Sequence, residues 1–499
     1  MSSYRLIARR IADGINPEIF SGRITIENGF IKTLEQGDFA VEAASDRFFD
    51  ENKLISPAFI DAHGHSDISL MAMKEAQGKT AQGIAFEISG NCGLSPFPLS
   101  KYNCGHLQEL YRNYNIRLDW HDYASYMEKL QKIAPQLELF PQVGHNTLRS
   151  CVAGYEKKHL QPSELAEMCQ ILDRELAAGA VGLSAGLLYV PGCFADMDEL
   201  VRLLQVVARH NKVFTIHLRS EGNELENALS ETLTAARRAG LKKLHLSHLK
   251  TSGAKNFHKI DFILDALASP DLQVSGDIYC YDASMTQLSV ILPAPFDEYD
   301  DVSLMQKLRQ ADIFADIRRK MLAERPADYW EKVRIVSAPE AYRQFNGMLL
   351  TDAAEKCQID PVELCLQMLA NDAPGTTAAF HTLSRDNMEL LAAHSSVVPG
   401  SDESSRNLSQ AFGSSHPRGF GNHAEYFALR RKQGADIGSI ISEMSYKTAQ
   451  IFNLPHIGAI TSGNRAVFTV IDLENYRSRA TFAEPHSLAE GAEILRFGE

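Results

Sequence analysis

Between about residues 54 and 455 the chain repeats one unit, in which a short apolar strand, a polar turn and an amphipathic helix follow one another. Strands that alternate with helices in this way pair in parallel, as βαβ units. Eight units in roughly 400 residues fit a (β/α)8 barrel of the TIM type better than an open, doubly wound α/β sheet. No Gly-x-Gly-x-x-Gly motif follows an early strand, which disfavours dinucleotide binding. The predicted strands lie in LISPAFIDAH (54–63), GIAFEISGNC (83–92), LELFPQVGH (137–145), AVGLSAG (180–186), KVFTIH (212–217), KKLHLSH (242–248), QVSGDIY (273–279) and SSVVPGSD (395–402).

Three segments between these strands predict amphipathic helices, at 163–179, 196–210 and 224–240. Each carries leucines and alanines at positions i, i+3 and i+4, which places them on one face of a helix. Two of the three end at glycine, the residue that most often terminates a helix.

The two ends of the chain resemble each other in pattern. Residues 1–57 read as short strands with an Asn-Gly turn at 28–29, and residues 455–499 contain the compact apolar run VFTVID. We therefore expect a small β-sandwich domain built from both termini, and a catalytic barrel over residues 58–454. The alternative is that each end separately decorates the barrel.

One stretch interrupts the strand and helix alternation. Residues 294–345 are helical in pattern, rich in charge and poor in strand signals. We interpret them as a helical insertion before the last barrel strand, placed as a lid over the site. A peripheral helical pair with no part in catalysis is the alternative.

Composition narrows the class of protein. Lys and Arg number 50 against 63 Asp and Glu, a net charge of −13, so a binder of duplex nucleic acid is disfavoured. No apolar run approaches the ~20 residues of a membrane span, and no stretch near the start has the length of a secretory signal. Eight scattered cysteines show no disulfide framework and indicate a reducing, cytoplasmic location.

Polar side chains gather where the predicted strands end, which in a barrel is the face that carries the active site. His63 and His65 are two apart on one strand and share a side. His217 and His248 are 31 residues apart, one βα unit, so they fall on adjacent strands. A lone buried histidine is more often a satisfied core residue than a ligand. Here further polar residues occupy such ends, so the joint placement predicts a metal site: Asn91, Cys92, His145, Tyr189, Tyr279, Tyr281 and Asp402.

These residues carry a family resemblance. AFIDAHGHSD (58–67) resembles the His-x-His motif of the amidohydrolase superfamily, and SGNCGLSPFP (89–98) resembles the Gly-Asn-Cys-Gly motif of the D-aminoacylases, or N-acyl-D-amino-acid deacylases. Related hydantoinases and dihydroorotases use a carboxylated lysine on the fourth strand, and the matching segment here, AVGLSAGLLYVPG, contains no lysine. Further matches run along nearly the whole chain: HLRSEGNELENAL, LSHLKTSG, DIYCYDASMT, PGSD, HPRGFGN and GAITSGNRAVFTVID.

The resemblance implies a role for each matching residue. A tightly held zinc ion would be bound by Cys92, His217 and His248, and Asp402 would act as general acid and base. A second, weaker metal position would use His63 and His65, with Cys92 bridging. The groups implied to bind the substrate carboxylate are Lys250, Tyr189, Tyr281 and Arg418. For Lys250 and Arg418 a solvated surface position is the alternative.

The sequence departs from the family pattern at a few positions. Tyr279-Cys280-Tyr281 stands where Tyr-Pro-Tyr is usual, and Glu403 replaces the glycine after Asp402, adding a negative charge near the metal. The glycine at position 64, inside His-x-His, is harmless to ligation. The first two departures affect the expected substrate more than the reaction.

The expected function is zinc-dependent hydrolysis of the amide bond of N-acyl-D-amino acids, with a small-molecule substrate and no nucleic-acid or membrane partner. Three alternatives remain: a hydantoinase-like or dihydroorotase-like cyclic-amide hydrolase, a non-catalytic scaffold with this fold, and a deacylase for another acyl donor.

Overall fold

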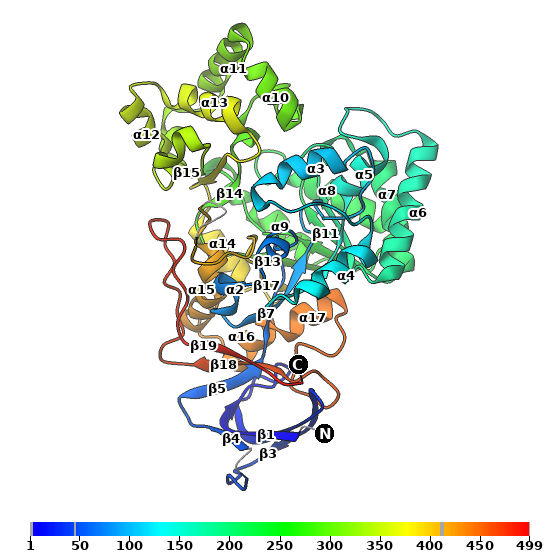
Figure 1. Ribbon diagram of the computed structural model, residues 1–499, viewed down its shortest axis with the longest axis vertical. Helices are drawn as coiled ribbons and strands as arrows, with labels where there is room; N and C mark the ends of the chain where they lie inside the picture. Colours follow the sequence, from blue (N-terminus) through cyan, green and yellow to red (C-terminus); the bar gives the residue numbers. More distant parts are fainter. Residues whose placement is uncertain (1–2, 44–45, 410–413, 499) are drawn as a thin grey trace.

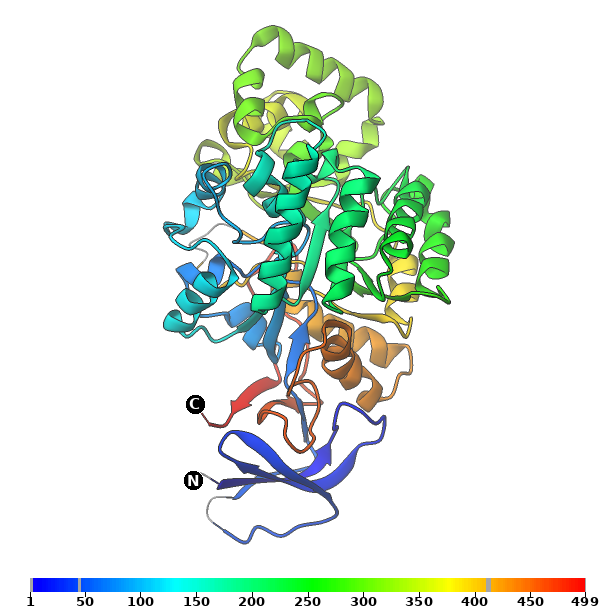
Figure 2. The same ribbon diagram turned by 90° about the vertical axis from the view of Figure 1, so that its right-hand side faces the viewer.

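A computed structural model describes residues 3–43, 46–409 and 414–498 of the chain. Figures 1 and 2 show a central barrel, with a sheet made from both chain ends on one side and a mainly helical insertion on the opposite side. The two termini of the described chain lie together at the sheet.

The predicted (β/α)8 barrel is confirmed. The barrel strands form two hydrogen-bonded sheets, of three and six strands, and within each sheet neighbouring strands pair in parallel. The third predicted strand is split at Gln142 into β8 and β9. The ring closes between the last and first strands, where the Ala62 amide donates to the Pro399 carbonyl over 3.2 Å. The strands are β6 (Phe59–Asp61), β7 (Ile84–Ser89), β8 (Glu138–Pro141), β9 (Val143–Gly144), β10 (Gly182–Gly186), β11 (Val213–His217), β12 (Lys243–Leu246), β13 (Gln273–Ile278) and β17 (Val397–Pro399).

The helices of the barrel connections form because their apolar faces pack against these strands. The three helices predicted from periodicity are α6 (Pro162–Ala178), α7 (Met197–Arg209) and α8 (Leu225–Ala239). Asp196 caps α7 by accepting from the Glu199 amide, and Gly179 and Gly240 end α6 and α8 with positive φ angles. The others are α1 (Ser69–Ala72), α2 (Gln77–Thr80), α3 (Cys104–Leu110), α4 (Tyr123–Ile133), α5 (His145–Ala153), α9 (Ile260–Leu267), α14 (Arg385–Ala392), α15 (Arg418–Lys432), α16 (Ile437–Met444) and α17 (Tyr446–Phe452).

The strands from both chain ends, expected as a small sandwich, belong to one continuous hydrogen-bonded sheet of seven strands. Strand β18 from the C-terminal end pairs antiparallel with β5 from the N-terminal end, which joins the two ends. A separate apolar cluster that includes Leu6, Ile24 and Phe468 lies in this sheet. Its strands are β1 (Ser3–Ile11), β2 (Phe20–Glu27), β3 (Phe30–Gln36), β4 (Asp46–Phe49), β5 (Lys53–Pro57), β18 (Val467–Asp472) and β19 (Ala492–Arg496).

The insertion has a hydrophobic core of its own, which runs from Leu288 to Phe380. It is therefore wider than the residues 294–345 that the charged helical stretch indicated, because it also includes a three-stranded antiparallel sheet. Its elements are β14 (Ser284–Gln287), α10 (Asp301–Leu308), α11 (Ala311–Glu324), β15 (Val333–Ser337), α12 (Leu350–Cys357), α13 (Pro361–Asp372) and β16 (Thr377–Phe380).

Within the described part of the chain, no helix combines the length and the apolarity that crossing a bilayer requires.

Candidate metal centre

Strand β6 leads directly into two histidines of the predicted site. His63 is fully buried, and its Nδ1 lies 3.1 Å from Oδ2 of Asp277. Between His63 and His65, a Cβ atom at position 64 would stand 2.0 Å from the carboxyl carbon of Glu87. The glycine at this position is therefore required by the packing, because the Glu87 carboxylate fills the space that a side chain would occupy.

Cys92 follows strand β7 in a tight turn. Gly90 and Gly93, on either side of it, both have positive φ angles. A Cβ atom on Gly93 would stand 2.1 Å from Oδ1 of Asn146, so only glycine fits there. This turn carries the Cys92 sulfur away from the strand and toward the histidines.

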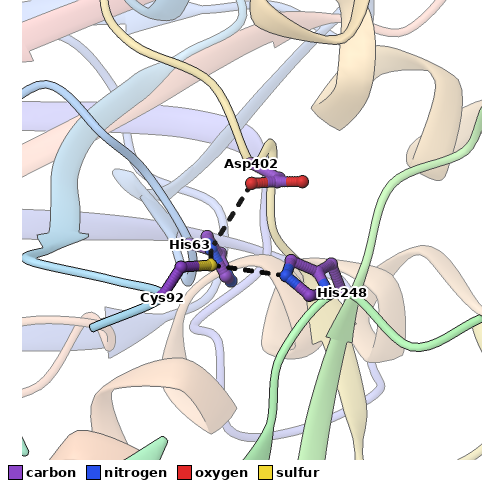
Figure 3. Close-up of side chains that lie close together, drawn as sticks. All are labelled: His63, Cys92, His248 and Asp402. Atoms are coloured by element: carbon purple, nitrogen blue, oxygen red, sulfur yellow. Dashed lines mark hydrogen bonds and ion pairs between the residues drawn. The ribbon is translucent and has the colours of Figure 1, made fainter. Parts of the chain in front are cut away.

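Four predicted residues converge on one point (Figure 3). The Cys92 Sγ lies 3.4 Å from Nε2 of His63 and 3.3 Å from Nε2 of His248. Oδ1 of Asp402 lies 3.6 Å from Nε2 of His63 and 3.2 Å from Nε2 of His65. One ligand atom from each of His63, Cys92, His248 and Asp402 lies within 4.8 Å of the other three, which is the spacing of a metal site.

His217 completes the donor set. Its ring centroid is 4.4 Å from that of His248, and the residue is 5% exposed. Neither ring nitrogen of His217 has a hydrogen-bond partner among the described residues. Because buried polar atoms are almost always satisfied, an unpartnered histidine beside a cysteine and a second histidine indicates an ion. One thiolate and two imidazoles are ligands that suit zinc.

The backbone at the site is strained. Cys92, His248 and Asp402 have φ angles of 52°, 36° and 50°, in the left-handed region that residues with a Cβ rarely adopt. Such conformations cost roughly 1–3 kcal/mol each and are concentrated at functional sites. Three of the converging residues are thus held in conformations that local stability alone does not favour.

Charged neighbours set the ionisation of the acidic groups. Burial by itself raises the pKa of Asp402, but the Arg418 guanidinium and His248 outweigh it and hold that pKa well below its usual range. Burial also raises the pKa of Cys92, and His63 and His248 outweigh it in the same way. Asp402 is therefore a carboxylate, and Cys92 is prepared to be a thiolate.

Lys250 and Glu221 flank His248. Nζ of Lys250 lies 2.7 Å from Oε1 of Glu221, and the same carboxylate oxygen lies 3.0 Å from Nδ1 of His248. Nδ1 of His248 also lies 2.7 Å from Nζ of Lys250, so this nitrogen faces both the ammonium and the carboxylate. Together the two side chains orient the ring so that Nε2 faces Cys92 and the candidate metal site. The sequence analysis did not single out Glu221, although it stands four residues after His217 in the quoted HLRSEG segment.

The structure separates the residues predicted to bind substrate. Tyr189 lines the cavity described below, and its ring centroid is 4.9 Å from that of His217. Tyr281 is not among the cavity-lining residues, and its hydroxyl donates to the Pro417 carbonyl over 3.4 Å.

Tyr279 occupies the cavity wall instead. Its buried hydroxyl has no partner among the described residues, and the Arg418 guanidinium lies 4.5 Å from its ring centroid. A strand period of two puts both Tyr279 and Tyr281 on the side of the inward-facing Asp277, so it does not separate the two phenols.

Asp277 is a further functional residue that the sequence reasoning missed. Its Oδ2 contacts Nδ1 of His63 and Nε2 of His245, and its Oδ1 accepts from the backbone amide of His248 over 3.0 Å. One carboxylate thus orients a ring and a backbone segment of the site. The only sequence signal was an acidic residue inside an apolar strand.

Glu403, which replaces the family's glycine after Asp402, uses its carboxylate in hydrogen bonds to the backbone. Its carboxylate oxygens accept from the backbone amides of Ser404 over 3.0 Å and of His416 over 3.3 Å. Its main role is to fasten the loop that follows β17.

The site opens into a cavity of about 1200 Å³ between the carboxyl ends of the barrel strands and the insertion. Nearly all of the predicted metal ligands line it, as do Lys250, Arg418 and Tyr189, while His63 lies beneath them. Such a cavity at this face of a (β/α)8 barrel is the usual location of an active site.

No protein-family model matches the chain. It is 27% identical over 466 residues to an N-acyl-D-glutamate deacylase of Alcaligenes xylosoxydans xylosoxydans, and the match covers 92% of this chain and 85% of the relative. It is 25% identical over 496 residues to an N-acyl-D-aspartate deacylase of the same organism, spanning 97% and 89%.

A solved structure has the same fold over nearly the whole chain. It is an N-acyl-D-glutamate deacylase from Bordetella bronchiseptica, complexed with zinc and a phosphonate inhibitor that mimics the tetrahedral intermediate. The TM-score is 0.82 with 24% identity, and the match covers 99% of this chain and 94% of that chain. The chain is therefore similar over most of its length to N-acyl-D-amino-acid deacylases, and it shares the fold of a solved member of that group.

Proposed function

We propose that this protein hydrolyses the amide bond of N-acyl-D-amino acids to a carboxylate and a free D-amino acid, with zinc as its metal. The observation that carries the proposal is the convergence of Cys92, His248 and Asp402 beside the unpartnered ring of His217. The deacylase relatives support the choice of an amide substrate.

Cys92, His217 and His248 would hold the tightly bound zinc ion, since the Cys92 sulfur lies 3.3 Å from Nε2 of His248 and the ring of His217 packs against that of His248. His63 and His65 offer a second, weaker position, with the Cys92 sulfur between the two. When bound, zinc polarises the amide carbonyl and lowers the pKa of a bound water to about 7.

Asp402 is the general acid and base of the proposal. It is ionised at neutral pH, and its Oδ1 points toward the histidines while Oδ2 faces Arg418. As a carboxylate it accepts the proton of the attacking water, and it then delivers this proton to the nitrogen of the leaving amine.

The substrate carboxylate needs positive charge and hydrogen-bond donors. Lys250 and Arg418 supply the charge, and the unpartnered hydroxyl of Tyr279 lies beside both, with its ring centroid 5.7 Å from Nζ of Lys250. Tyr189 adds a phenol on the side of His217. Tyr281 has no place in this clamp, because its hydroxyl is directed to Pro417.

The charged residues would fix the carboxylate of the substrate, and the metal would fix its amide carbonyl. With both groups fixed, only one enantiomer places its amide bond at the site. The test is an assay of N-acetyl-D- and N-acetyl-L-amino acids beside hydantoin and dihydrouracil. We expect turnover of the D series only. Equal turnover of both enantiomers would indicate a general amidase, and hydrolysis of the cyclic amides alone would indicate a hydantoinase.

Two alternative functions can be distinguished from the proposed one. A hydantoinase-like site would need a lysine on β10, and this strand reads GLSAG. A non-catalytic scaffold would be indicated if a folded, zinc-loaded protein hydrolysed none of these substrates.

We also place the protein in the cytoplasm, with a small-molecule substrate as its partner. The eight cysteines are all free thiols, which supports a reducing compartment. The net charge of −13 disfavours nucleic acid as a second partner.

A further inference from the structure

The two sides of the cavity differ in chemistry. One side is formed by connections that follow the second, third and fourth barrel strands, β7, β8/β9 and β10. The other is formed by residues after the sixth to eighth strands, β12, β13 and β17. In an eight-stranded ring these two sets of strands lie opposite each other, with the candidate metal site between them.

The first side is apolar. Five residues, which we call the apolar wall, line it: Leu94, Leu107, Leu110, Leu188 and Val190. Among the described residues, none of the cavity-lining side chains from these three connections is a lysine, arginine, aspartate or glutamate. Uncharged polar and aromatic side chains also line this side, among them His106 and Tyr111. The amide nitrogen of Asn146 is already used, because it donates to the carbonyls of Gly186 and Tyr189.

The apolar wall begins at the metal site itself. Leu94 lies two residues after Cys92, and Leu188 and Val190 flank Tyr189, whose ring contacts His217. Leu188 lines the cavity and is 42% exposed, so its side chain is open to a bound group. The insertion lines the cavity with both apolar and charged side chains, among them Ile291, Asp301 and Arg325.

The opposite side carries the charge. Lys250 follows β12, and Arg406 and Arg418 follow β17. The carboxylate end of an N-acyl amino acid therefore belongs on this side. Its acyl substituent, on the far side of the amide carbon, then points toward the apolar wall.

We propose that the apolar wall is a binding subsite for the acyl chain, and that the preferred substrates carry medium-length or long fatty acyl groups in place of acetyl. This inference rests on the proposed deacylase function. A cavity of about 1200 Å³ exceeds the ~300–1000 Å³ of ordinary small-molecule sites, so an acetyl group would leave most of it unfilled.

The test is the hydrolysis of one D-amino acid acylated with acetyl, butanoyl, hexanoyl, octanoyl and decanoyl groups by the zinc-loaded enzyme. Each methylene that is fully buried contributes up to about fourfold in binding. We expect kcat/KM to rise at least roughly tenfold from acetyl to octanoyl. A second series keeps the acetyl group and lengthens the D-side chain, from D-alanine to D-norleucine.

A matched pair of variants locates the effect. Leu188→Glu should lower the octanoyl-to-acetyl ratio of kcat/KM, because it places a charge on the apolar wall. Leu390→Glu, at a leucine that is 47% exposed on α14 and outside the cavity lining, should leave this ratio unchanged. The melting temperatures of both variants identify any loss of folding. The acyl series measured on the unchanged enzyme tests the proposal even if a variant does not fold.

If the acetyl substrate is hydrolysed and kcat/KM stays flat or falls as the acyl chain lengthens, the acyl subsite is overturned and the deacylase function stands. A gain confined to the D-side-chain series would overturn it as well, since the apolar wall would then hold the amino-acid side. Hydrolysis of no member of either series would overturn the deacylase proposal and the subsite with it.

Discussion

Nη1 of Arg418 lies 2.9 Å from Oδ2 of Asp402, and both side chains are almost entirely buried. The contact is an ion pair whose geometry is not that of a hydrogen bond. Arg418 stands at the first residue of α15, whereas Asp402 lies in the loop just after the last barrel strand, β17. The helix thus fixes the charge state of the residue that we assign to proton transfer.

Asp402→Asn is expected to remove that proton transfer while it keeps the size of the side chain. Because Cys92, His217 and His248 remain, the variant should fold and retain its zinc. Its kcat should fall by ~10²–10⁴, the usual contribution of a positioned acid and base. A lower melting temperature with near-normal kcat would instead make Asp402 a structural residue of its loop, so both quantities are measured on one preparation.

Glu221→Gln tests the carboxylate that orients His248. The amide removes the negative charge beside Nδ1 of His248, and it also leaves Lys250 without its anionic partner. We expect zinc affinity to fall by about 10–100-fold, measured by competition with a chromogenic chelator. Glu224→Gln, at an exposed residue just before α8, is the control. Equal zinc affinity of the two variants would remove Glu221 from the metal site.

Lys79 tests the buried network under the site. It forms ion pairs with Asp61 and Glu87, and all three side chains are fully buried. Lys79→Met leaves two buried carboxylates without a cation, which should cost about 3–5 kcal/mol of unfolding free energy. Denaturant unfolding at pH 7 measures this loss, and Lys74→Met, at an exposed lysine, should show little change.

The loss of stability in Lys79→Met should also depend on pH, and the direction of this dependence follows from the pKa of Glu87. Burial and the neighbouring Asp61 raise the pKa of Glu87 even with Lys79 present, and removal of the cation raises it further. A carboxyl group whose folded pKa lies above its unfolded value loses stability as the pH rises through that range. Lys79→Met should therefore be less impaired at pH 5 than at pH 7. Equal impairment at both pH values would contradict the ionised network.

The barrel was predictable because its signal is repeated. Each βα unit carries the same pattern, and the pattern also identifies the strand ends that bring His217 and His248 to neighbouring positions. The insertion was bounded less well. Its strands β14 and β16 have four residues each and read SMTQ and TAAF, so neither gives a clear strand signal, and their antiparallel pairing places them with the helices.

The metal ligands were predictable from residue type and position together, whereas their supports were not. Asp277 and Glu221 act through contacts between different strands and loops, which no local pattern records. Tyr279 and Tyr281 lie at the point where β13 ends and its alternation stops, so the sequence could not decide which phenol faces the cavity. The left-handed conformations of Cys92, His248 and Asp402 also left no trace in residue type.

Zinc content tests the central claim most directly. The purified protein, Cys92→Ser and the control Cys169→Ser, which changes a half-buried cysteine on α6, are dialysed together and analysed for metal and for hydrolysis of an N-acyl-D-amino acid. We predict about one zinc per chain with activity in the unchanged protein and in Cys169→Ser, and loss of both in Cys92→Ser, since the soft thiolate ligand is gone. Full zinc retention in Cys92→Ser would contradict the site proposed for this barrel.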